Sequence, residues 1–223
     1  MALTSFLDWK QVQEARLPSA PFKRSFTQPV TSVQHAIERA KEREHLFKMI
    51  LDKANKFGAA NEGTVYTDIK TEKSIQDKMN RPGKAKKLNE IGDFLRGAIV
   101  VPSNEDAERV AAFLAKAATK DYKVVAFEFK KDPKSGDVTG YSGSYHIDIE
   151  IDGMVCEIQV MTTTLWNIKD VVHKYGYQGT RSGKGIDPQM AQDFRRTFKR
   201  LQMPKGEFEK PKVKKFRYDP AND

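Results

Sequence analysis

The chain has 223 residues and a formal net charge of +9 at pH 7, with 39% hydrophobic and 31% charged residues. This balance indicates a globular domain with short extensions, and no apolar run approaches the roughly 18 residues of a membrane span. The N-terminal residues lack the apolar core of a secretory signal, and a single cysteine, Cys156, excludes a disulfide framework. We therefore expect a cytoplasmic protein without a membrane partner, whose positive charge favours phosphate-bearing partners.

Composition divides the chain into three parts. Residues 1–30 contain three prolines and little hydrophobic periodicity, which we interpret as an N-terminal arm. Residues 31–202 carry the periodic segments of one domain, and they contain no Cys/His zinc pattern, G-x-S-x-G elbow or Walker loop. Residues 203–223 form a basic tail, which we expect to be mobile and either to add affinity for RNA or another polyanion or to be a solvated end.

Helical and extended patterns alternate along the domain. Helices are predicted over residues 31–57, 71–80, 104–119, 163–177 and 188–202. Strands are predicted over 96–102 and 122–130, followed by a hairpin, and Ser32 and Ser103 are suited to cap two of the helices. The order predicts an α/β (α+β) fold with a mixed, largely antiparallel sheet of four to five strands and helices packed on one face.

The most informative local pattern is residues 140–161, GYSGSYHIDIEIDGMVCEIQVM. An Asp-Gly pair between alternating segments is a strong signal of a β-hairpin, because both turn positions need positive φ. With Asp152 and Gly153 in the turn, the isoleucines, Met154 and Cys156 share one apolar face. Cys156 is therefore expected to be a small core residue.

The other face of this hairpin carries polar and charged side chains: His146, Asp148, Glu150, Glu157 and Gln159. The predicted register places Asp148 opposite Glu157 and His146 opposite Gln159. Like charges directly opposite each other destabilise a plain sheet. The face either meets water, as half-buried antiparallel sheets do, or binds a divalent cation or polyphosphate complex that offsets the repulsion.

Cationic and acidic residues with possible functions precede the hairpin. Lys70, Ser74 and Lys78 are four positions apart, so they would share a face of the short predicted helix. The alternative interpretation of this face is a solvated lysine surface. Asp93 stands just before a predicted buried strand, and Arg96 enters that strand. A carboxylate at such a place is either a turn residue or a metal ligand.

Aromatic residues and a histidine flank the hairpin. Tyr141 lies in the loop GYSG before it, and the helix after it contains Trp166 and His173. Tyr141 could cover an edge of the core, and His173 could be a hydrogen-bonded helix residue without a function. Trp166 is interpreted as a packing residue.

In this order, the motifs resemble the synthetase domain of the RelA/SpoT family, which makes alarmone nucleotides. The family pattern runs from a Lys-x-x-x-Ser helix through an Asp before a strand to Gly-Tyr, His, Glu-x-Gln and a Trp/His helix. The resemblance spans residues 31–200 and implies a nucleotidyltransferase-like synthetase fold. Its matching positions are Lys70, Ser74, Lys78, Asp93, Gly140, Tyr141, His146, Glu157, Gln159 and His173.

The sequence also departs from that pattern. Asp68 and Ser142 stand where the family usually has arginines, and the loop before His146 is one residue longer than usual. Arg96 follows Asp93 by only three positions, closer than the family's strand arginine. The D-x-x-R-G and GYSG stretches are similar to a divergent small branch found in phage proteins and toxins. The chain has no His-Asp dipeptide, so we expect no alarmone hydrolase activity.

The resemblance implies transfer of pyrophosphate from ATP to the 3′-hydroxyl of a nucleotide, with magnesium as cofactor and (p)ppGpp or (p)ppApp as product. The acceptor would be GDP, GTP or an adenine nucleotide. Two alternatives stay open. One is a toxin-like pyrophosphorylation of the tRNA 3′ end, which suits the basic charge. The other is a non-catalytic nucleotide-binding or structural module that keeps the fold without the phosphate-binding arginines.

Under this resemblance, Asp93 and Glu157 would hold magnesium, and Glu157 would also accept the proton of the acceptor hydroxyl. The residues expected to bind the ATP phosphates are Lys70, Ser74, Lys78 and Arg96, with Lys86 or Lys87 as second choices. Tyr141 would stack on the acceptor base. His146 and Gln159 would orient the acceptor, and His173 would lie under the open face of the sheet.

Overall fold

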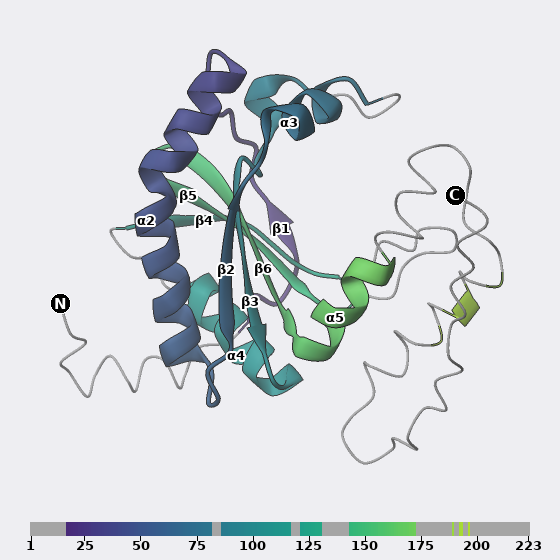
Figure 1. Cartoon of the computed structure of the whole chain (residues 1–223). Helices are drawn as coiled ribbons and strands as arrows, with labels where there is room; N and C mark the ends of the chain where they lie inside the picture. Colours follow the sequence, from purple (N-terminus) through teal and green to yellow (C-terminus); the bar gives the residue numbers. More distant parts are fainter. Residues whose placement is uncertain are drawn as a thin grey trace.

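A six-stranded β-sheet forms the centre of the protein in the computed structural model, shown in Figure 1. The structure describes residues 17–81, 86–116, 121–130, 143–172, 189, 192, 193 and 196. The strands are β1 (Phe22–Lys23), β2 (Thr64–Ile69), β3 (Leu95–Val101), β4 (Lys123–Phe129), β5 (Tyr145–Ile151) and β6 (Met154–Thr162). They are arranged in the order β1-β4-β5-β6-β3-β2, and within the described part only β6 and β3 run parallel. The predicted mixed, largely antiparallel sheet is confirmed, with six strands rather than four or five.

Helices cover the sheet unevenly. They are α2 (Val33–Gly58), α3 (Glu72–Met79), the 3-10 turn η1 (Leu88–Glu90), α4 (Asn104–Lys116) and α5 (Thr163–Val172). Figure 1 shows α2 and α4 against one side of the sheet and α5 on the other side, at the end of β6. We expected helices on one face alone, so the position of α5 corrects that expectation. Over the described residues, no helix is long and apolar enough to cross a membrane.

The hairpin of β5 and β6 has the predicted register. Asp152 and Gly153 form the turn with φ of 47° and 74°, as an Asp-Gly turn requires. Ile147 lies opposite Ile158, and Ile149 opposite Cys156, on the buried side of the sheet. The polar residues of both strands therefore lie together on the opposite face.

The apolar face of the sheet packs against α2 and α4 at close range. Gly97 of β3 leaves room for α2, since a Cβ atom there would lie 2.4 Å from Leu51 Cδ1 and 2.9 Å from Phe47 Cε1. Both predicted caps are present: the backbone N–H of His35 donates to Ser32 Oγ, and Ser103 Oγ accepts from the backbone of α4. This packing fixes which face of the sheet stays accessible.

The short helix α3 begins later than the lysine spacing suggested. It spans Glu72–Met79 with Thr71 as its N-cap, so Lys70 precedes the helix and shares no helical face with Ser74 and Lys78. The backbone N–H of Lys70 instead donates to the carbonyl oxygen of Phe94, at the start of β3. Pairing between strands, and not helical periodicity, sets the position of Lys70.

Two strands were not predicted from the sequence. β2 is an edge strand in which more and less exposed residues alternate, but no hairpin turn or buried run marks it. β1 has two residues and forms because Phe22 and Lys23 pair with β4, a long-range contact without a local signal.

β1 belongs to the segment that we interpreted as an arm, of which residues 1–16 lie outside the described part. The predicted tail, residues 203–223, also lies outside it, and the predicted helix over 188–202 is described at four residues, all helical.

Gln28 joins the N-terminal segment to the sheet. Its side chain is 2% exposed; Nε2 donates to the carbonyl oxygens of Ile91 and Val155 at 3.0 and 2.9 Å, and Oε1 accepts from the N–H of Val155 at 3.0 Å. One amide therefore holds together the N-terminal segment, the loop before β3 and the start of β6.

Replacing Gln28 with alanine should destabilise the fold, because buried backbone groups of Ile91 and Val155 would lose their partners. We expect a loss of about 1–3 kcal/mol in the free energy of unfolding, measured by urea denaturation. Gln34→Ala, on the exposed side of α2, is the matched control and should change stability by less than about 0.5 kcal/mol. Equal effects of the two substitutions would contradict a structural role for Gln28.

Candidate active site

Four charged side chains form a row across the polar face of the sheet. The strand register aligns Asp68 on β2, Arg96 on β3, Glu157 on β6 and Asp148 on β5. Aligned residues of neighbouring strands share a face and are about 5 Å apart. This charged row therefore brings together four residues from separate parts of the sequence, two of which, Arg96 and Glu157, were candidate site residues.

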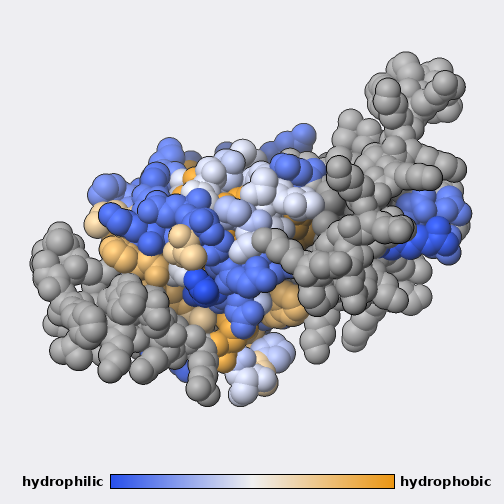
Figure 2. Space-filling model, turned by 90° about the horizontal axis from the view of Figure 1, so that it is seen from below, coloured by the Kyte–Doolittle hydropathy of each residue, from blue (hydrophilic) through white to orange (hydrophobic). Residues whose placement is uncertain are grey.

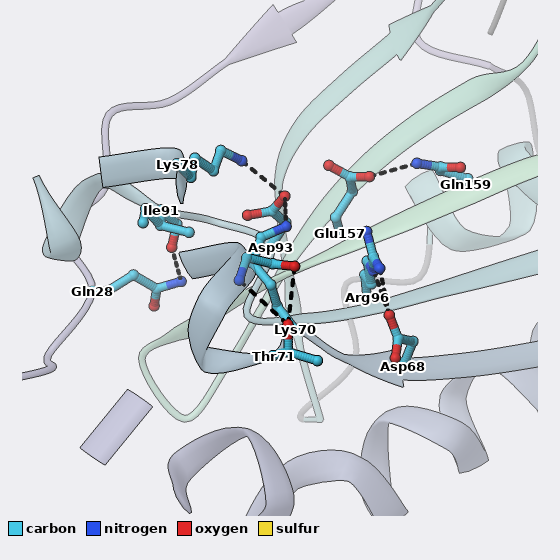
Figure 3. A network of polar contacts seen from close by, with 11 residues as sticks. Gln28, Asp68, Lys70, Thr71, Lys78, Ile91, Asp93, Arg96, Glu157 and Gln159 are labelled. Atoms are coloured by element: carbon cyan, nitrogen blue, oxygen red, sulfur yellow. Dashed lines mark hydrogen bonds and ion pairs between the residues drawn. The ribbon is translucent and has the colours of Figure 1, made fainter. Parts of the chain in front are cut away.

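Beside this row, Asp93 binds two lysines. Asp93 Oδ2 accepts a hydrogen bond from Lys78 Nζ at 2.8 Å and one from Lys70 Nζ at 3.0 Å (Figure 3). The side chains of Lys70 and Asp93 are only 9% and 12% exposed. Burial opposes the charge on Asp93, but the ammonium groups of Lys78 and Lys70 lower the pKa of its carboxyl to about 2. Asp93 therefore stays ionised and gathers two cations at the entrance of β3.

One oxygen of Asp93 has no hydrogen bond. Oδ1 is buried and has no partner among the described residues, although buried carboxylate oxygens are almost always hydrogen-bonded. A hard cation is a suitable partner for such an oxygen. Within the described part, no three acidic, histidine or cysteine side chains lie close enough to hold a metal by themselves. This does not conflict with magnesium, which usually takes one or two carboxylates and completes its shell with phosphate and water.

Arg96 is held by a residue on the neighbouring strand. Its Nε and Nη2 both donate to Asp68 Oδ2, at 2.8 and 2.5 Å. Burial works against the charged guanidinium, but the hydrogen bonds and charge of Asp68 raise the pKa of Arg96, with smaller contributions from Asp93 and Glu157. Asp68, the departure from the family pattern noted above, thus fixes the orientation of Arg96 at the centre of the row.

Asp148 and Glu157 lie opposite each other, as predicted. Burial, together with the charge of Glu157, raises the pKa of Asp148 to about 6. Glu157 Oε1 accepts a hydrogen bond of 2.6 Å from Gln159 Nε2, two positions along the same strand (Figure 3). Asp148 was recognised in the sequence only as the opposite residue of Glu157; its burial next to the lysines makes it part of the site.

His146 occupies a sheltered position beside Gln159. The two residues are paired in the register, and His146 Nε2 lies 3.1 Å from Ser144 Oγ. Burial, with the nearby Lys130, lowers the pKa of His146 to about 3. The imidazole is therefore neutral at pH 7, so it can orient a ligand by hydrogen bonding but is a weak proton acceptor.

Further cations surround the acidic residues. Burial lowers the pKa of Lys86, and the charges of Lys78 and Lys23 add to this effect, while Asp93 and Asp148 oppose it. Lys86, a second choice from the sequence, therefore lies among the site residues. Lys23 was not predicted, because only the pairing of β1 with β4 brings it to the sheet.

Some predicted residues are not brought to this group. Ser74 is exposed, and its backbone N–H donates to the N-cap oxygen of Thr71, so it stabilises the start of α3. Lys87 is exposed as well, and its backbone N–H donates to Glu90. Tyr141 and His173 lie outside the described residues, and their proposed roles stay predictions.

Comparison with known proteins relates the fold of this chain to solved structures. No protein-family model and no curated protein sequence matches the chain. Solved structures do match. Small alarmone synthetase 1 from Bacillus subtilis superposes with a TM-score of 0.59 at 17% identity, covering 75% of this chain and 89% of that one. A GTP pyrophosphokinase family protein from Streptococcus pneumoniae gives 0.55 at 21% identity, covering 76% and 86%. The chain has the fold of the small alarmone synthetases.

The predicted RelA/SpoT-like synthetase domain is thereby confirmed at the level of the fold. The same Bacillus synthetase has been solved bound to its product pppGpp, with a TM-score of 0.53 to this chain at 17% identity over 76% of this chain and 87% of that one. In the present protein, the synthetase fold carries the Asp93–lysine cluster and the charged row on its open face.

The electrostatics of the site predict how stability depends on pH. The pKa of Asp148 is about 6 in the folded protein, against 3.8 for an ordinary aspartate, so between these values the folded state holds a proton that the unfolded chain has lost. Stability should therefore fall as pH rises from about 4 to 6 and then level off. Asp148→Asn should be more stable than wild type by about 1–3 kcal/mol at pH 8, and the difference should vanish at pH 4. Urea denaturation with a chelator present tests this, and a pH-independent difference would contradict it.

Proposed function

We propose that the protein transfers pyrophosphate from ATP to the 3′-hydroxyl of an acceptor nucleotide. The main support for this proposal is the cluster of Lys70, Lys78 and Asp93 beside the charged row, on the open face of a small alarmone synthetase fold. Such a transfer depends mainly on positioning the reactants and neutralising phosphate charge, which is what a cluster of buried cations and carboxylates provides.

In this proposal, Lys70, Lys78 and Arg96 bind the triphosphate. Each ammonium group has three N–H donors, and Asp93 takes one from each lysine, which leaves donors for phosphate oxygens. Asp68 Oδ2 accepts hydrogen bonds from Nε and Nη2 of Arg96, so Nη1 would be left to bind a ligand. Lys86 adds a fourth cation from the loop before β3.

Asp93 and Glu157 would hold magnesium, and the orphaned Asp93 Oδ1 fits that role. When bound, the ion would neutralise charge on the transferred phosphates. Glu157 is also the proposed general base, because its carboxylate lies between the phosphate-binding cations and the residues expected to orient the acceptor. Gln159, hydrogen-bonded to Glu157 Oε1, holds that carboxylate in place.

His146 and Gln159 are proposed to orient the acceptor ribose and phosphates. The neutral imidazole of His146 and the amide of Gln159 lie next to each other on β5 and β6. The binding of pppGpp by the Bacillus synthetase supports a guanine nucleotide as acceptor. The adenine analogue and the 3′ end of tRNA are the other acceptors to be tested.

Incubation of the protein with magnesium and ATP labelled at the β-phosphate distinguishes these acceptors. We expect label to enter GDP or GTP. Transfer to an adenine nucleotide would make the product (p)ppApp, and transfer to tRNA would identify the toxin-like reaction. Absence of transfer to all of them would contradict the proposed function and leave a non-catalytic module.

Glu157→Gln tests the catalytic role of this carboxylate. The substitution keeps the shape of the side chain but removes its basicity, so turnover should fall about 100-fold or more. Nucleotide binding should change less, because Lys70, Lys78 and Arg96 remain. Without magnesium the melting temperature should stay level or rise, since repulsion with Asp148 is relieved.

Glu150→Gln is the matched control. Glu150 lies on the same face of β5 but pairs with Val155 and lies 3.7 Å from Lys123, away from the lysine cluster. This variant should keep full transfer activity. If Glu157→Gln is as active as this control, Glu157 has no part in the chemistry.

A further inference from the structure

Four large apolar or aromatic side chains are exposed in the described part of the protein: Phe22, Met49, Tyr66 and Phe129. Over the face shown in Figure 2, hydrophilic residues separate the apolar ones. Tyr66 differs from the other three because it lies on the polar face of the sheet, in the strand that leads to Lys70. Tyr66 has no role in the chemistry proposed above.

Tyr66 is part of an ordered aromatic stack. Its ring lies 4.8 Å from that of Trp166 on α5, with only 11° between the planes. Lys169 Nζ lies 3.8 Å from the centroid of the Trp166 ring. The Trp166 ring thus contacts both a tyrosine and a cation, whereas Tyr66 remains 43% exposed. The stack fixes the plane of the Tyr66 ring and leaves part of it accessible.

The register places this stack next to the charged row. Tyr66 lies two positions before Asp68 on β2, so both point to the same face. On that face its neighbours across the sheet are Ala98 and then Gln159. The methyl group of Ala98 adds no bulk beside the ring. Tyr66 is therefore one step along the strands from the row of Asp68 and Arg96.

The distance between Tyr66 and Lys70 matches the length of one extended nucleotide. Lys70 follows Tyr66 by four positions, roughly 13 Å along an extended chain. A molecule that binds its phosphates at Lys70 and Lys78 and lies along β2 would reach Tyr66 with its other end. That end is a flat aromatic base, and any base can stack on an aromatic ring held in a fixed plane.

We propose that the Tyr66–Trp166 stack is the base-binding subsite of the phosphate donor and takes the adenine of ATP. Tyr66 contacts the base, and Trp166 is a positioning residue that supports the ring from behind. This inference rests on the proposed function, since it takes the donor phosphates to bind at Lys70 and Lys78. It explains why a large aromatic residue is exposed on the polar face of the sheet.

The test compares ATP with tripolyphosphate, which has the phosphates but lacks the adenosine. The dissociation constants of ATP and of inorganic tripolyphosphate, each with magnesium, are measured by calorimetry for wild type, Tyr66→Leu and Tyr66→Phe. Tyr66→Leu should weaken ATP binding about tenfold or more, the usual effect of losing one base–aromatic stack, and leave tripolyphosphate binding unchanged. Tyr66→Phe should retain the affinity for ATP. Phe22→Leu, at the opposite edge of the sheet, is the matched control and should bind both ligands as wild type does.

The other outcomes separate the two proposals. If wild type binds neither ligand, the proposed function fails together with this inference. If wild type binds both and Tyr66→Leu binds ATP equally well, only the base subsite is overturned. Equal weakening of both ligands would mean that Tyr66 acts through the fold, which also overturns it. GDP is measured in the same way, and a loss confined to GDP binding would assign the ring to the acceptor instead and contradict the proposal.

Discussion

The shared carboxylate of Asp93 is the interaction on which the site depends. Two lysines from different places, one before α3 and one at its end, approach the same oxygen within 3.0 Å. Without an anion between them, Lys70 and Lys78 would repel each other in a nearly buried position, and burial already lowers the pKa of Lys70. Asp93 therefore assembles a concentrated positive charge that the protein could not otherwise hold. The second oxygen of this carboxylate, Asp93 Oδ1, has no hydrogen-bond partner in the described part of the protein.

The charged row across the sheet also combines a cation with neighbouring carboxylates. Asp68 neutralises Arg96, and the adjacent Glu157 and Asp148 carry negative charge of their own. Lys70, Lys78 and Arg96 are each hydrogen-bonded to an aspartate, whereas Glu157 and Asp148 face each other across the hairpin. Burial is the main cause of the raised pKa of Asp148, and repulsion from Glu157 adds to it. A cation bound beside Glu157 and Asp148 would relieve this repulsion, and a phosphate bound beside Lys70 and Lys78 would be attracted to their charge.

The parts that could be predicted from the sequence are those with local causes. The turn at Asp152 and Gly153 follows from two adjacent residues, and it fixes every pairing of the hairpin, including Asp148 with Glu157. Lys70 and Lys78 were expected to lie close together because of helical spacing, and this reason was wrong. Lys70 is extended and Lys78 is helical, and both bind the carboxylate of Asp93. Lys23 and Gln28 could not be found, since a two-residue strand and a single buried amide leave no periodic signal. Tyr66 was missed with the edge strand that carries it.

The parallel pairing of β3 with β6 has a consequence for how the protein folds. Arg96 and Glu157 become neighbours only after α4, β4 and β5 have been placed between them along the chain. Contacts between residues so distant in sequence form slowly, because the intervening chain must be ordered before they contribute stability. The β5–β6 hairpin, in contrast, can form early from local contacts. A nascent chain would therefore possess the Asp148–Glu157 carboxylate pair before Arg96 lies beside it, and the complete charged row would form late in folding.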